Sequence, residues 1–79
     1  MKVRVLFFGA TAGVVGKREV TLSLAGNGTT GDAFNAVLAE YPRLQDHKLL
    51  FSVNQEFASG FEIVHDGDEL AVFTAVSGG

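Results

Sequence analysis

The chain has 79 residues, 47% of them hydrophobic and 19% charged, with a formal net charge of −3. This length supplies apolar material for one small domain and is too short for two. The six Lys and Arg residues are spread along the sequence, so nucleic-acid binding through phosphate neutralisation is not expected. No apolar run approaches the ~20 residues of a membrane span and no signal peptide is evident, so we expect a cytoplasmic protein without a membrane segment. Cysteine is absent, which excludes disulfides, thiolate metal sites and a cysteine nucleophile.

The first part of the chain predicts two paired strands joined by a loop. Residues 2–8, KVRVLFF, alternate between two faces that both become apolar, as in a central strand covered on both faces. Residues 18–24 alternate more clearly and indicate a half-exposed strand paired with the first. The glycine-containing residues 9–17 are expected to form the hairpin loop between them. Val14 and Val15 in this loop either fold back under the sheet or meet a partner.

The middle of the chain predicts one amphipathic helix within residues 29–42. Its apolar stripe has the i, i+3, i+4, i+7 spacing and consists of Phe34, Val37, Leu38 and Tyr41. Thr30 is the expected N-cap, and Pro42 marks the exit from the helix. A polar connection is expected to follow.

The last part of the chain predicts the remaining strands. Residues 49–53, LLFSV, indicate a buried strand, followed by a turn at residues 54–55 and a short strand around Phe57. A second turn at residues 66–67 precedes the final strand, residues 69–73. One helix lying across one mixed sheet of four to five strands buries all these apolar faces most simply. The predicted fold class is therefore α+β.

Two internal patterns resemble binding sites, but simpler explanations are favoured. Residues 26–31, GNGTTG, match the dinucleotide-binding pattern G-x-G-x-x-G, yet the preceding strand alternates and no room remains for a doubly wound sheet. A flexible loop followed by a helix start explains them better. Asp66, Asp68 and Glu69 could bind a hard cation, but turn formation accounts for them without a metal.

The two histidines, His47 and His65, are expected at the surface or in a turn, because neither has a serine or carboxylate at a catalytic spacing. We therefore predict no metal site and no active site inside the domain. Any reactive group is expected at the end of the chain.

The sequence changes abruptly after the last strand, where Ala75-Val76-Ser77-Gly78-Gly79 follows an apolar segment. We predict a domain of residues 1–74 and a flexible tail of residues 75–79. Ser77 and Gly78 could thread a narrow channel of another protein and bring the carboxylate of Gly79 to a buried reaction centre. Phe73, Ala75 and Val76 are the expected apolar contacts with that partner. Simple fraying of a chain end is the alternative.

A carboxylate at the chain end has a restricted chemistry. It is ionised at neutral pH and is a poor electrophile, so it must be activated, most naturally as a mixed anhydride with AMP. Displacement of AMP by a lysine would make the protein a covalent tag. Displacement by a persulfide sulfur would leave a thiocarboxylate and make the protein a sulfur carrier.

Several segments occur in an order that suggests a family. They are KVRVLFFG (residues 2–9), AEYPRL (39–44), LLFSVNQEF (49–57), DGDELAVF (66–73) and VSGG (76–79). Together they resemble the β-grasp, ubiquitin-like sulfur carriers and, more closely, the small subunits of molybdopterin synthase. The resemblance extends over nearly the whole chain.

The resemblance implies a β-grasp fold and a reaction at Gly79. A ubiquitin-activating-like enzyme would consume ATP to adenylate this residue, and a persulfide donor would convert it to a thiocarboxylate. The tail would then enter the large subunit of molybdopterin synthase and donate sulfur to cyclic pyranopterin monophosphate, within a heterotetramer of two small and two large subunits. The resemblance implies no stably bound cofactor.

Two departures from the family pattern bear on the choice of partner. Thr74-Ala75 replaces the usual Pro-Pro before the final valine, and residues 9–17 lack an Arg-Glu pair often found there. Three alternatives remain open: a sulfur carrier for thiamine or a thiolated tRNA base, a ubiquitin-like modifier joined to lysines, and a plain binding domain with a frayed tail.

Overall fold

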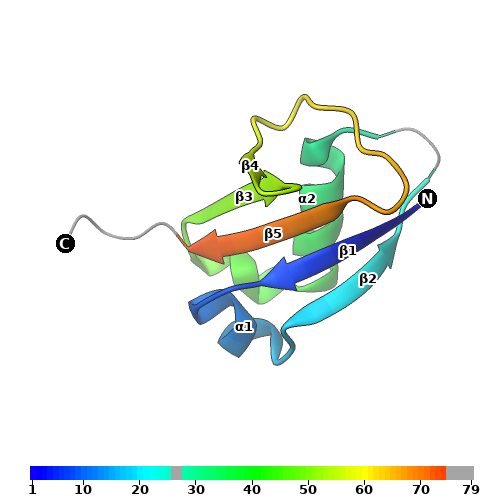
Figure 1. Ribbon diagram of the computed structural model, residues 1–79. Coiled ribbons are helices and arrows are strands. Elements are labelled where there is room, and N and C mark those ends of the chain that lie inside the picture. Colours follow the sequence, from blue (N-terminus) through cyan, green and yellow to red (C-terminus); the bar gives the residue numbers. More distant parts are fainter. Residues whose placement is uncertain (26–27, 75–79) are drawn as a thin grey trace.

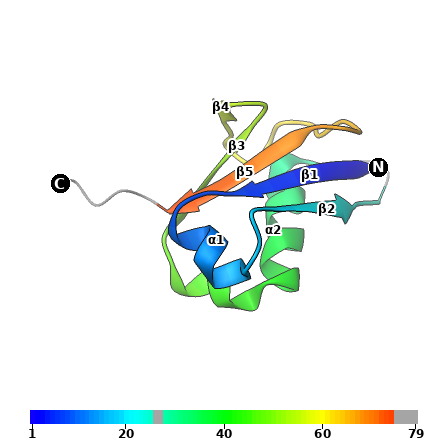
Figure 2. The same cartoon turned by 60° about the horizontal axis from the view of Figure 1, so that its bottom comes forward.

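The computed structural model of the chain describes residues 1–25 and 28–74, and its centre is one mixed sheet (Figure 1). The elements are β1 (Lys2–Phe7), α1 (Ala10–Val15), β2 (Glu19–Ser23), α2 (Thr30–Glu40), the 3₁₀ helix η1 (Pro42–Asp46), β3 (Leu49–Val53), β4 (Glu56–Phe57) and β5 (Glu69–Thr74). The strands lie in the order β2-β1-β5-β3-β4, with β1 and β5 parallel and the other neighbours antiparallel. Figure 2 shows both α-helices on the same side of the sheet. The predicted α+β fold with one main helix is confirmed.

The core lies between the sheet and α2, because alternate side chains of the central strands point to that face. The register of β1 and β5 places Val5 beside Leu70 and Phe7 beside Val72. The buried apolar residues in the described part of the chain are Val3, Val5, Phe7, Ala33, Val37, Leu44, Val64, Leu70 and Val72. Burying a large apolar side chain contributes roughly 1.5–3 kcal/mol, so this layer is the main source of stability.

The prediction of a loop at residues 9–17 is wrong in one respect, because this segment contains the short helix α1. Val14 and Val15 pack against the core. Of the two expectations for these residues, folding back under the sheet is therefore confirmed. Thr11 is buried, and its hydroxyl lies 2.6 Å from the carbonyl oxygen of Phe8 and 3.0 Å from that of Val72. The helix closes at Gly16, whose φ of 79° suits a residue without a β-carbon. Six residues are too few to show a helical period in the sequence.

The main helix begins one residue earlier than expected, with Thr29 rather than Thr30 as its N-cap. The Thr29 hydroxyl accepts a hydrogen bond from the Asp32 backbone N–H at 3.2 Å, and the Asp32 carboxylate accepts one from the Thr29 N–H at 3.0 Å. This reciprocal pair satisfies two donors at the helix N-terminus. Thr30 is instead buried, where its hydroxyl donates to Glu62 at 2.8 Å.

The exit from the helix lies where Pro42 predicts it, but the connection is not simply polar. Helix α2 ends at Glu40, and Pro42 begins η1. Leu44 points from η1 into the core and is 0% exposed. The connection therefore closes one end of the hydrophobic layer.

The segment between β4 and β5 is tied to the start of α2 by Glu62. Its carboxylate accepts hydrogen bonds from the Ser59 N–H and hydroxyl, the Gly60 N–H and the Thr30 hydroxyl at 2.8–3.1 Å. These donors, led by the Ser59 backbone N–H, lower the pKa of Glu62 to about 2. Main-chain bonds from Thr30 to Glu62 and from Gly31 to Gly60 add to the attachment.

We predict that Leu44→Ala lowers the free energy of unfolding by about 2–5 kcal/mol, because it leaves a cavity at a fully buried position. The neighbouring exposed substitution Gln45→Ala is the control and should change stability by less than about 0.5 kcal/mol. Urea unfolding of both variants measures the difference. Equal effects would contradict the placement of η1 against the core.

We also predict that Glu62→Gln lowers the melting temperature at pH 7. Because the pKa of Glu62 is lower in the folded chain than its ordinary value of 4.5, the ionised carboxylate stabilises the fold. This contribution is complete above about pH 4.5 and is lost as the pH falls toward 2, so wild type and variant should converge at acid pH. Thermal melts from pH 7 to 2 measure this, with the exposed Glu40→Gln as a charge-matched control. A difference that does not depend on pH would contradict the role of the carboxylate.

Candidate functional site

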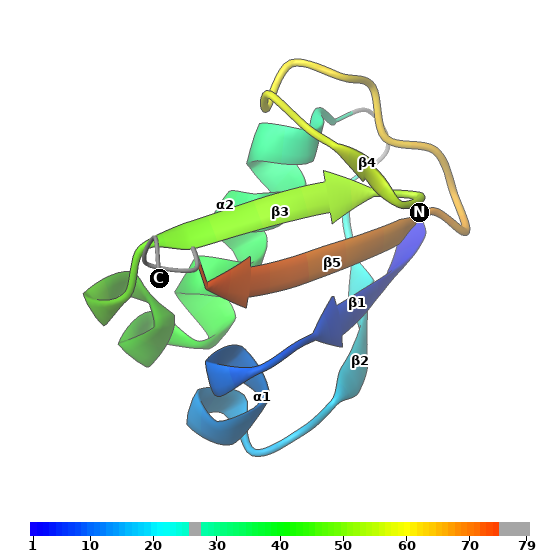
Figure 3. The ribbon, with the colours of Figure 1, turned by 60° about the vertical axis from the view of Figure 1, so that its left-hand side comes forward.

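The end of β5 is the point from which the predicted reactive segment would start. β5 is the central strand, and its last residue, Thr74, pairs with Leu49 of β3. On its other side the Phe8 N–H donates to the Val72 carbonyl oxygen at 3.0 Å. The end of β5 is therefore held by neighbours on both sides (Figure 3). The predicted site residues Ala75, Val76, Ser77, Gly78 and Gly79 lie outside the described residues.

Apolar side chains gather on the face of the sheet away from α2. Phe73 and Leu50 lie opposite each other on β5 and β3. The ring centroids of Phe57 and Phe73 are 5.9 Å apart. Phe8, Leu50 and Phe57 are 51%, 41% and 76% exposed. We call Phe8, Leu50, Phe57 and Phe73 the open-face cluster. Large apolar side chains grouped at the surface are typical of a protein-binding site.

This cluster corrects two predictions from the sequence. Strand β1 is an interior strand of the sheet, as expected, but Phe8, which directly follows it, is exposed. Strand β3 was expected to be buried, but Leu50 is exposed while Leu49 and Phe51 pack on the core. In both cases the reason is the single layer of helices, which covers only one face of the sheet.

A hollow of about 570 Å³ lies next to the open-face cluster. Ser52 and Ala71, paired across β3 and β5, are small and leave the space open. Phe8, Phe73 and Thr74 line it on the side where β5 ends, and Glu69 adds a carboxylate. The hollow can accept an apolar side chain of a partner beside the start of the predicted tail.

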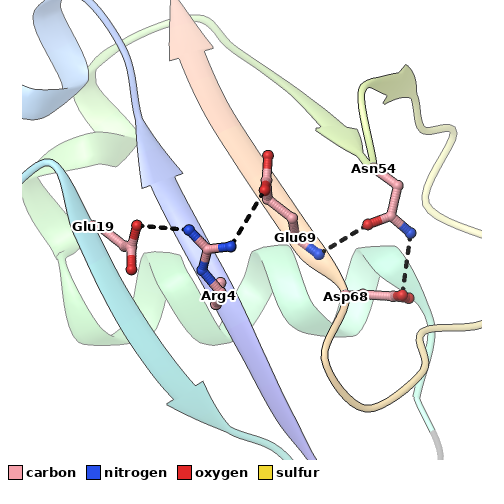
Figure 4. Close-up of polar contacts among 5 residues, drawn as sticks. All are labelled: Arg4, Glu19, Asn54, Asp68 and Glu69. Atoms are coloured by element: carbon pink, nitrogen blue, oxygen red, sulfur yellow. Dashed lines mark hydrogen bonds and ion pairs between the residues drawn. The ribbon is translucent and has the colours of Figure 1, made fainter.

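Polar contacts cross the same face where β5 begins (Figure 4). Arg4 Nη2 lies 2.9 Å from Glu19 Oε1, and its Nη1 lies 3.6 Å from Glu69 Oε2. The hydrogen bond from Arg4 lowers the pKa of Glu19. Asn54 accepts from the Glu69 N–H and donates to Asp68, each at 3.1 Å. The face is thus polar at the start of β5 and apolar at its end, like the rim and centre of a protein interface.

The acidic residues before β5 serve the turn. Asp66 accepts from the Lys2 N–H at 2.6 Å, and Asp68 accepts from the His65 N–H at 2.8 Å. The latter bond lowers the pKa of Asp68. Within residues 1–25 and 28–74, no three His, Asp or Glu side chains are placed to hold a metal ion.

The remaining sequence patterns also have structural explanations. Gly31 approaches Gly60 so closely that a β-carbon on Gly31 would lie 2.9 Å from the Gly60 oxygen. This contact accounts for the last glycine of the G-x-G-x-x-G pattern, of which Gly26 and Asn27 lie outside the described residues.

His47 and His65 are exposed, as expected. No helix in the described part of the chain is long and apolar enough to cross a membrane.

The sequence singles out Phe73 as a candidate contact but not the other residues of this face, Phe8, Leu50, Ser52 and Ala71. The alternation within residues 49–53 and 69–73 places Leu50, Ser52, Ala71 and Phe73 on one face, which was the available signal. Pairing of these two strands could not be read from the alternation. The structure supplies it.

Comparisons with a family profile and with known proteins agree on one family. A sequence profile described as the ThiS family matches residues 5–79. The molybdopterin synthase sulfur carrier subunit of Mycobacterium tuberculosis is 35% identical over 82 residues, which cover 100% of this chain and 99% of that protein. Small archaeal modifier protein 1 of Haloferax volcanii is 37% identical over 82 residues, covering 91% and 94%.

Solved structures agree with these sequence relationships. The crystal structure of SAMP1 from Haloferax volcanii has a TM-score of 0.87 at 33% identity and covers 100% of both chains. A protein–protein complex of subunits 1 and 2 of molybdopterin-converting factor from Helicobacter pylori contains a chain with a TM-score of 0.72 at 21% identity, again covering 100% of both chains. The latter likeness shows a shared fold.

Proposed function

The chain belongs to the ThiS family, and from this premise we propose that it is the sulfur-carrier small subunit of a molybdopterin synthase. The observation that carries the proposal is the family match through residue 79, together with full-length relatives that bear this name. The central β5, which ends beside an open apolar face, supports it from the structure. The domain supplies the docking surface, and the segment after Thr74 supplies the reactive group.

In the proposed reaction the carboxylate of Gly79 attacks the α-phosphorus of ATP, and pyrophosphate leaves. The terminal sulfur of a donor persulfide then displaces AMP from the acyl adenylate. A thiolate attacks the remaining S–S bond, so that a disulfide forms and the carbonyl carbon keeps one sulfur as a thiocarboxylate. ATP is consumed by an adenylating partner, and we propose that these steps take place in the cytoplasm.

The proposed acceptor complex contains the large subunit of molybdopterin synthase, in a heterotetramer of two small and two large subunits. Gly78 and Ser77 would pass through the entrance of the large subunit, and Ala75 and Val76 would contact its surface beside Phe73. The thiocarboxylate would deliver sulfur to cyclic pyranopterin monophosphate. The family resemblance places a proline where this chain has Thr74, the last residue of β5, and threonine does not fix the backbone φ angle as proline does.

A second function, covalent modification of other proteins, is favoured by one specific observation. A relative at 37% identity is named a small archaeal modifier protein. Both functions require an activated Gly79 and differ only in the nucleophile, which is a persulfide sulfur in one case and a lysine amine in the other.

One experiment separates these functions. The chain is incubated with ATP, an adenylating enzyme of the ubiquitin-activating type and a persulfide donor, and its intact mass is recorded. Exchange of one oxygen for sulfur supports the carrier, and adducts to other proteins support the modifier. No change, with an enzyme shown to activate a known carrier, would contradict both. Addition of the large subunit and the pterin precursor then tests molybdopterin formation, and its failure would point to another sulfur acceptor.

We predict that deletion of Gly79 abolishes thiocarboxylate-dependent sulfur transfer and leaves the melting temperature nearly unchanged. The deletion removes the proposed reactive carboxylate from its position, while the core residues in the described part of the chain lie within residues 3–72. Intact mass and thermal melts measure the two effects. A large fall in melting temperature would mean that Gly79 stabilises the domain.

We predict that Ala71→Arg weakens binding to the large subunit by at least about tenfold, because the new side chain fills the hollow beside the open-face cluster. The control is Asn35→Arg, which adds the same charge at an exposed position of α2. Isothermal titration calorimetry measures both affinities. Equal affinities would place the interface elsewhere on the domain.

A further inference from the structure

Two large apolar residues are exposed outside the open-face cluster, on the segment between β4 and β5. Phe61 is 86% exposed and Ile63 is 63% exposed. They flank Glu62 in the sequence. In Figure 1 this segment runs above the sheet, from β4 toward the right of the view, whereas β5 ends at the left. We call Phe61, Ile63 and the hollow beside them the loop patch.

The loop that carries these exposed side chains is attached to the rest of the domain at several points. The Glu62 carboxylate binds the loop through Ser59 and Gly60 and binds α2 through Thr30. Ile63 also forms an antiparallel bridge with Thr29. A loop anchored in this way presents its apolar side chains in a defined arrangement, which lowers the conformational entropy that binding must remove.

A hollow of about 390 Å³ lies between this loop and the β3–β4 hairpin. Val53, Phe57 and Ile63 give it an apolar lining, and three carboxylates lie around it: Glu56, Glu62 and Asp68. Among the described residues that line it, none is Lys or Arg. Hydrogen bonds lower the pKa values of Glu62 and Asp68, so these two carboxylates are charged at neutral pH. The hollow therefore combines apolar side chains with carboxylates, and Asn54 and His65 complete its polar lining.

We propose that the loop patch binds a protein segment that carries a large apolar side chain next to Lys or Arg. The apolar side chain would enter the hollow beside Ile63, the exposed Phe61 would contact the same segment outside the hollow, and the cation would lie near Glu56 and Asp68. The same negative charge disfavours nucleic acid and an anionic membrane surface as occupants. This complementarity singles out a basic, partly apolar polypeptide.

The loop patch goes beyond the proposed carrier function because it lies away from the end of β5. Phe57 is the border between the two surfaces, since it lines this hollow and belongs to the open-face cluster. A second protein that occupies the loop patch without covering Phe57 would leave the open face free for another. The carrier would then bring two proteins together.

The test is a titration of the ¹⁵N-labelled chain with a short synthetic peptide in which Lys alternates with Leu and Trp. We expect saturable chemical-shift changes concentrated in residues 53–68. A peptide with Glu in place of Lys should bind at least about tenfold more weakly. No saturable binding, equal binding of both peptides, or changes centred on Phe8 and Phe73 would overturn the proposal.

Variants make the test specific. Phe61→Ser combined with Ile63→Ser should weaken binding of the Lys peptide by at least about tenfold, because both apolar contacts are removed. Glu56→Lys should weaken the Lys peptide and strengthen the Glu peptide, whereas Asp46→Lys, an exposed acid in η1, should change neither. All substituted positions are exposed, and the dispersion of the amide spectrum checks that each variant is folded. An unchanged affinity in the first variant would overturn the proposal. The test is independent of thiocarboxylate formation.

Discussion

The parallel pairing of β1 with β5 is the constraint on which the rest of the structure depends. Parallel neighbours cannot be joined by a tight turn, so the chain between them must cross the sheet. Residues 8–68 make this crossing and include α2, which covers one face. Because β2 and β3 pair with the outer edges of β1 and β5, the last strand of the chain becomes the central strand of the sheet.

This arrangement explains why the two proposed surfaces exist. One layer of helices can bury only one face of the sheet, so the side chains that alternate with the core residues remain open to a partner. The long connection from β4 to β5 has no helix of its own, and hydrogen bonds to α2 keep it in place. Stability therefore resides on the α2 side, while recognition is left to the opposite face and to the connecting loop.

Much of this fold could be predicted from local sequence patterns. The apolar stripe from Phe34 to Tyr41, the alternation of residues 49–53 and the turn signals at Asn54 and Gly67 are local, and the structure confirms the elements that they predict. The family resemblance is confirmed by a match over residues 5–79. Helix α1 was missed because Thr11 and Val15 are stabilised by contacts with distant parts of the chain.

The N-cap and the open face show the same limit. Thr29 and Thr30 are both suitable cap residues. The spacing from Thr29 to Asp32 is a local signal for Thr29, and the contact of Thr30 with the distant Glu62 is a non-local one. The open-face cluster depends on which strands are neighbours, and that is a property of the whole chain. The predicted partner contacts of Phe73, Ala75 and Val76 remain predictions.

The central place of β5 also has a consequence for synthesis on the ribosome. A chain that still lacks residues 69–74 keeps only the β1–β2 and β3–β4 pairs, so its sheet is split into two parts. Domains usually fold as complete units during or after translation. Folding of this domain must therefore await the emergence of its final strand from the exit tunnel. A truncated chain that stops before β5 would expose its core and be open to proteolysis, and every folded copy has been translated at least to Thr74.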